Sequence, residues 1–171
     1  MSAYRRVTRQ CAVSELRPEL FRAVRDHARQ MGVGELGDDV EICCETRSEV
    51  RSSGGVGAWL VGDPDPVHYT AVLLTSQWLI WARGGKSETV AASAQLKGLK
   101  AGVLTTPKNH EIEMDVTGFF GNTRRRIRGI LAFGDEPAAQ KLCEAVLAAV
   151  ARLNPRRKPK IFQIFGIPFG R

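Results

Sequence analysis

Polar and apolar residues alternate most regularly in two neighbouring segments, residues 111–116 and 126–133. The first segment alternates acidic with apolar residues, and the second begins by alternating arginine with apolar residues. A period of two predicts β-strands that are buried on one face. The Gly121-Asn122 pair between the two segments predicts the turn of a hairpin.

The densest basic run of the chain, residues 124–128, lies in this predicted hairpin. A hairpin folded about the predicted turn places Asp115 opposite Arg128, with Glu113 on the diagonal. These carboxylates offset part of the positive field of the arginines. The sequence therefore favours a structural role for the run over a nucleic-acid or phosphate site.

Further segments with strand character precede the hairpin. They are residues 40–50, which alternate cleanly, residues 67–75 and 78–83, which predict another hairpin, and the weaker run 88–94. Residues 58–61 lie in a turn-rich connection and form either a short strand or part of the loop. Residues 1–13 have no clear periodicity, and residues 96–104 fit no single pattern.

Two segments have the period of amphipathic helices. The first covers residues 18–31, begins with a proline, and is followed by Gly32, a residue suited to ending a helix. The second covers residues 137–153, begins after Asp135, which can cap it, and has a continuous apolar stripe. Such a stripe has to pack on a sheet or on the mouth of a barrel.

The order of these elements resembles that of prokaryotic pleckstrin-homology-like (PH-like) domains, which include bacterial PH and GRAM-like domains. The hairpin sequence Leu-Thr-Ser-Gln-Trp-Leu-Ile at 74–80 resembles the family's Leu-Thr-x-x-Arg-Leu-Ile signature, with Trp78 in place of the arginine. The resemblance implies an α+β fold, a PH-like bent β-barrel of about seven antiparallel strands capped by a C-terminal helix, here with an extra N-terminal helix. It divides the chain into an N-terminal extension (1–37), a PH-like domain (38–153) and a basic, aromatic tail (154–171).

Composition sets limits on location and redox state. No apolar run approaches the roughly 20 residues that cross a bilayer, and the basic N-terminus has no apolar segment behind it, so the expected location is cytoplasmic, with a peripheral membrane position as the alternative. Of the four cysteines, Cys43 and Cys44 are adjacent and should point to opposite faces of a strand. We expect reduced, apolar packing residues in preference to a disulfide or a metal site.

The sequence contains no pattern typical of an enzyme. Its three histidines are scattered, and no Gly-x-Ser-x-Gly, Walker-type or His-Glu-x-x-His motif occurs. We therefore expect no catalytic residues, no metal and no cofactor.

Candidate binding residues lie in three places. In lipid-binding members of the PH-like family the ligand lies near positions that correspond to Arg47 and Arg51, although the family's dense basic pattern is missing here. Trp59 and Leu60 in the first long loop are the second candidate. The third is the tail, with its basic and aromatic residues Arg156, Arg157, Lys158, Lys160, Phe162, Phe165 and Phe169.

The net charge of +7 and the pI of about 9.6 favour acidic partners. The predicted function is a non-catalytic interaction module that docks to a protein partner or forms a homo-oligomer, with the terminal extensions as contact elements. A module that binds an anionic membrane surface through the first loop and the basic tail is the alternative. A nucleic-acid binder ranks lower, because the predicted barrel has no aromatic stacking pairs.

Overall fold

The computed structural model describes residues 4–37, 39–50, 66–86, 88–106, 111–121, 123, 125–155 and 160–162, with the backbone alone for 106 and 160–162. The elements in chain order are β1 (Tyr4–Gln10), a 3₁₀ turn η1 (Val13–Glu15), α1 (Pro18–Gln30), β2 (Val40–Val50), β3 (Val67–Thr75), β4 (Trp78–Gly84), β5 (Thr89–Gln95), β6 (Lys100–Thr106), β7 (Glu111–Phe119), β8 (Arg126–Gly134), α2 (Pro137–Leu153) and β9 (Lys160–Phe162).

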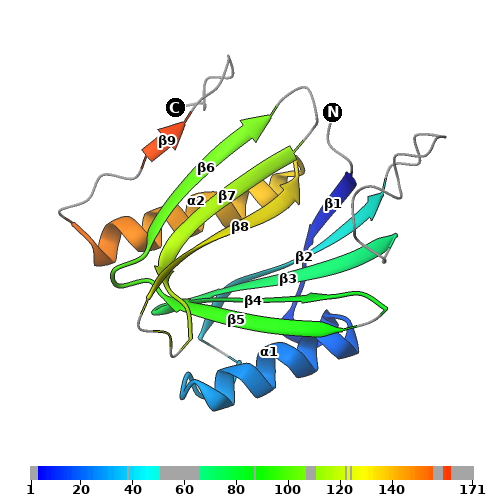
Figure 1. The fold of residues 1–171 in the computed structure, drawn as a ribbon, viewed down its shortest axis with the longest axis horizontal. Coiled ribbons are helices and arrows are strands. Elements are labelled where there is room, and N and C mark those ends of the chain that lie inside the picture. The colour runs from blue at the N-terminus through cyan, green and yellow to red at the C-terminus, as the bar shows by residue number, and fades with distance from the viewer. Residues whose placement is uncertain are drawn as a thin grey trace.

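The strands form two sheets (Figure 1). Sheet A has the order β1-β2-β3-β4-β5, and sheet B has the order β8-β7-β6-β9. All described pairings are antiparallel except the one between β6 and β9, which is parallel. The predicted α+β class is confirmed, and so are the two predicted helices.

The two sheets do not close into the predicted barrel. In the described residues, backbone pairing between the sheets is limited to one isolated bridge, Ala94 with Phe120. At the other junction, between β1 and β8, side chains make the connection. A barrel needs continuous ladders around its circumference, and these local contacts do not supply them.

Sheet A is covered on both faces. On one face, α1 packs Leu20, Val24 and Ala28 into an apolar cluster with residues of β2, β3 and β4. On the other face, α2 and the inner side of sheet B form the larger cluster. The run Ala71, Val72, Leu73 and Leu74 in β3 is fully buried, because its side chains alternate between the two cores.

The adjacent cysteines follow this arrangement. Cys43 belongs to the cluster under α1, and Cys44 belongs to the cluster between the sheets, so the predicted opposite orientation is confirmed. Burial raises the pKa of the Cys44 thiol to about 11 and that of Cys143 to about 12. Both thiols therefore stay protonated near neutral pH and act as small apolar residues.

The first strand, β1, has no counterpart in the sequence prediction. Few side chains of β1 point into the protein, and Thr8 is the buried one among them. Two of its arginines pair with buried carboxylates of other strands, Arg6 with Glu111 and Arg9 with Glu45. These arginines obscure the alternation of polar and apolar residues that would have indicated a strand. Their acidic partners lie far away in the sequence.

Strand β1 joins the two sheets through Thr8. The Gly134 amide donates a hydrogen bond to Thr8 Oγ1 (3.0 Å), and the Thr8 amide donates one to Glu136 Oε2 (2.9 Å). Glu136 is the N-cap residue of α2, where the sequence predicted Asp135, and its carboxylate bonds to β1 and not to its own helix. The predicted cap is therefore wrong.

The β7–β8 hairpin was predicted with the right partners and the wrong register. Arg128 lies opposite Thr117, and Asp115 lies opposite Ile130. Arg128 Nη2 still reaches Asp115 Oδ2 at 2.8 Å, across the diagonal, so the predicted ion pair is confirmed. The strands pair out to Phe119 and Arg126, which makes the connection longer than a turn on Gly121-Asn122.

We predict that Gly134→Ala destabilises the protein. A Cβ at position 134 would lie 2.8 Å from the Arg6 carbonyl oxygen, so β1 and β8 would have to separate. The expected loss is about 1–3 kcal/mol in the free energy of unfolding, measured by urea titration.

Gly37→Ala is the matched control, because a Cβ at Gly37 meets no atom within 4 Å. Its expected effect is within about 0.5 kcal/mol. Equal stabilities for the two variants would contradict the described contact between the sheets.

His27 fixes α1 to β5 and makes stability depend on pH. Its Nε2 lies 3.0 Å from the Oγ of the buried Ser93, and burial lowers the pKa of His27 below its ordinary value. The unfolded chain therefore takes up this proton at a higher pH than the folded chain does. The free energy of unfolding should fall as the pH drops below about 6.5.

We expect His27→Gln, which keeps a polar group without a titrating ring, to lose less stability than the wild type between pH 7.5 and 5.5. Urea titrations across that range measure the difference. Parallel pH profiles for the two proteins would exclude His27 as the titrating group.

Candidate functional site

The structure describes few of the binding residues that the sequence suggested. Arg47 lies on β2, is exposed, and pairs with Glu49 at 3.0 Å between Nη1 and Oε2. This carboxylate neighbour weakens Arg47 as an anion ligand. Those that lie outside the described residues are Arg51, Trp59, Leu60, Arg156, Arg157, Lys158, Phe165 and Phe169.

The described part of the tail pairs with its own chain. Residues Lys160–Phe162 form β9, which runs parallel to β6 with the register Gly102–Lys160 to Leu104–Phe162. The backbone of this segment thus extends sheet B along the edge of β6 (Figure 1). Lys160 and Phe162 therefore belong to a strand that pairs with β6 of the same chain.

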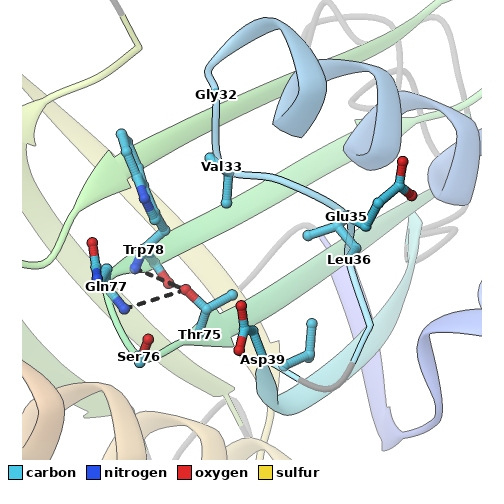
Figure 2. Close-up of a pocket in the computed structure, with 10 residues that line it drawn as sticks. Gly32, Val33, Glu35, Leu36, Asp39, Thr75, Ser76, Gln77 and Trp78 are labelled. Atoms are coloured by element: carbon cyan, nitrogen blue, oxygen red, sulfur yellow. Dashed lines mark hydrogen bonds between the residues drawn. The ribbon is translucent and has the colours of Figure 1, made fainter.

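A small pocket lies between the loop after α1 and the β3–β4 turn (Figure 2). Its volume is about 140 Å³. The turn is held by Thr75 Oγ1, which accepts hydrogen bonds from the amides of Gln77 (3.3 Å) and Trp78 (2.9 Å). Trp78, at the start of β4, lines the pocket.

The pocket is lined by both polar and apolar residues. Figure 2 shows Asp39 beside Thr75, whereas the Glu35 side chain points away from Thr75. Glu35 Oε1 pairs with Arg29 Nη2 at 3.0 Å. Ligand pockets usually have volumes of about 300–1,000 Å³, and this one is well below that range. Among the described residues, no group of three or more His, Cys, Asp or Glu side chains is placed to hold a metal ion.

The outer side of the β7–β8 hairpin is the other surface with unusual side chains. No described helix covers it, because α2 packs on the inner side of sheet B and α1 packs on sheet A (Figure 1). We call this surface the hairpin face. It consists of the outward residues Glu113, Asp115, Thr117, Phe119, Arg126, Arg128 and Ile130.

Large apolar side chains are concentrated at this hairpin. Among the described residues, five large apolar side chains are exposed, and three of them belong to β7 or β8. Phe119 is 48% exposed and Ile130 is 56% exposed on the hairpin face, whereas Ile127, which is 41% exposed, lies between Arg126 and Arg128 along β8 and points to the other side of the sheet. Phe119 lies opposite Arg126 and Ile130 lies opposite Asp115, so the two apolar residues share this face with the Thr117–Arg128 pair between them. Single exposed apolar residues are common on protein surfaces, whereas several on one face favour a contact surface.

Arginine and carboxylate groups surround these apolar side chains. The Arg126 guanidinium lies over the Phe119 ring at 5.6 Å, and Arg128 pairs with Asp115. The hydrogen bond with Asp115 raises the pKa of Arg128, which stays charged. With Arg125 also exposed, the β8 side of the surface has more positive than negative charge.

The sequence analysis interpreted this hairpin as structural and did not select Phe119 or Ile130 as site residues. The available signal was Ile130, which has the same parity as Arg126 and Arg128 along the strand. An isoleucine in the row of solvent-facing arginines is out of place for a simple polar surface. The signal is weak because isolated exposed apolar residues are normal.

Comparison of the chain with known proteins found no matching family model, no significant match among curated proteins and no significant match among solved structures. These comparisons therefore neither assign a family nor test the PH-like resemblance. None of the helices in the described part of the chain has the length and apolar character needed to cross a membrane.

Proposed function

We propose that this protein is a non-catalytic interaction module that binds an acidic, apolar segment of another protein through the hairpin face. The observation that carries the proposal is that Phe119 and Ile130 are both exposed on the hairpin face, with the Thr117–Arg128 pair between them and Arg126 beside Phe119. Apolar side chains provide contact area, and the exposed guanidinium groups of Arg125 and Arg126 beside Phe119 favour a partner with carboxylates.

A PH-like arrangement of strands is part of this proposal. It is supported by the antiparallel order β2-β3-β4-β5, the separate antiparallel order β6-β7-β8, and the C-terminal helix α2 that follows. In this interpretation β1 and α1 are additions that cover one edge and one face of sheet A. PH-like domains share no common ligand, so the choice of partner rests on the hairpin face.

The hairpin face is preferred over the terminal extensions as the contact surface. The described part of the tail, β9, pairs with β6 of its own chain. In the N-terminal region, Arg6 and Arg9 are engaged by Glu111 and Glu45.

A partner of different sequence is preferred over a second copy of the chain. A two-fold contact whose axis lies over β8 would bring the β8 strands of both copies close together. Arg126 and Arg128 would then face the same arginines in the other copy, and like charges in opposing strands are unfavourable. An acidic segment avoids this repulsion.

The proposal is tested by selecting displayed random 12-residue peptides on the folded full-length chain. We expect the selected peptides to combine large apolar residues with Asp or Glu. Binding of a selected peptide, measured by fluorescence polarisation, should weaken at least about tenfold in Ile130→Ser and in Phe119→Ser, as expected for central contact residues.

The matched control is Val90→Ser, because Val90 is 54% exposed on β5, away from the hairpin face. Peptides without acidic residues, or equal losses for Val90→Ser and Ile130→Ser, would contradict the proposal. Binding to phosphatidylcholine vesicles that contain phosphatidylserine, lost in Ile130→Ser, would assign the surface to a membrane instead.

A further inference from the structure

Two of the four cysteines lie side by side at the end of the β1–β2 pairing. The Sγ atoms of Cys11 and Cys43 are 4.0 Å apart, and the Cys11 amide donates a hydrogen bond to the Cys43 carbonyl oxygen (3.1 Å). Since Gln10 pairs with Cys44, the next step of the antiparallel ladder places Cys11 opposite Cys43. Residues directly opposite in such a ladder have Cα atoms about 4.5–5.5 Å apart, a separation that disulfides accept.

The position of Cys11 at the end of a strand allows the two sulfur atoms to move into bonding distance. It follows the last residue of β1 and is only partly buried, whereas Cys43 is buried under α1. Closing the 4.0 Å gap between the sulfur atoms to a bond of about 2 Å requires a side-chain rotation and a small shift at a strand end. That shift leaves the β3 side of the core in place.

We propose that Cys11 and Cys43 are a site of reversible disulfide formation by a low-molecular-weight disulfide such as oxidised glutathione. The Cys11 thiolate attacks the glutathione disulfide, forms a mixed disulfide and releases one glutathione thiolate. Cys43, having given up its proton, then attacks the Cys11 sulfur and releases the second glutathione. The chain loses two electrons and two protons, and one glutathione disulfide becomes two glutathione thiols.

The other two cysteines are internal controls. Cys44 points into the core between the sheets, on the opposite side of β2 from Cys43, and Cys143 lies in the same core on α2. Both are buried, whereas Cys11 is only partly buried, so a dissolved disulfide reaches Cys11 first and the oxidation we expect within one folded chain is between Cys11 and Cys43.

The electrostatic surroundings make the reaction slow near neutral pH. Burial raises the pKa of the Cys11 thiol, and burial raises that of Cys43 further. Since thiolate is the attacking species, the initial rate should rise by about tenfold per pH unit below the pKa of Cys11.

The bond would close a covalent loop around η1 and α1, which lie between the two cysteines in the chain. Because such a loop restricts the unfolded chain, the oxidised protein should have a higher Tm than the reduced one. Oxidation would thus lock α1 onto sheet A and leave the hairpin face unchanged.

The test incubates the folded full-length chain with oxidised glutathione at pH 8, then unfolds it in N-ethylmaleimide and measures the intact mass. We expect two of the four cysteines to escape alkylation, a linked peptide pair containing Cys11 and Cys43, and restoration of four alkylations by dithiothreitol. The Tm of the oxidised chain should exceed that of the reduced chain.

Cys11→Ser should abolish the linked pair, and Cys143→Ser should retain it. If Cys43→Ala folds, it should leave only the mixed glutathione adduct on Cys11. The proposal is overturned if the wild type stops at that adduct, if all four cysteines are alkylated after the oxidant, if Cys44→Ala abolishes the linked pair, or if the linked pair contains Cys143. None of these results depends on the proposed protein partner.

Discussion

The burial of β3 on both faces is the constraint on which the rest of the structure depends. Its central run, residues 71–74, is fully buried, so each face of sheet A needs its own cover. Helix α1 covers one face, and α2 with sheet B covers the other. Sheet A lies between the two cores, which explains why adjacent residues such as Cys43 and Cys44 have different surroundings.

This arrangement places the apolar stripes of both helices in the two cores, and no helix in the described part of the chain covers the outer side of sheet B. Sheet B has one buried face, formed by residues such as Met114 and Phe133, and one outward face. The apolar residues on that outward face, Phe119 and Ile130, do not contribute to either core. The proposed function follows from this asymmetry.

Local patterns in the sequence were sufficient for the helices, for β2 and for the β3–β4 hairpin, because period and turn residues lie within each segment. Strand β1 could not be predicted, since its arginines are paired by Glu111 and Glu45 from distant strands. The β7–β8 register failed because the loop is longer than its Gly-Asn pair suggested. The proximity of Cys11 and Cys43 depends on the β1–β2 pairing, so it could not be predicted from the sequence either.

Native-state hydrogen exchange followed by NMR tests the central claim most directly. We expect the slowest amides in residues 71–74 of β3, whose exchange should require global unfolding, and much faster exchange in residues 126–129 of β8, at the open edge of sheet B. Exchange in β3 that is as fast as exchange in this part of β8 would contradict a sheet A that is covered on both faces.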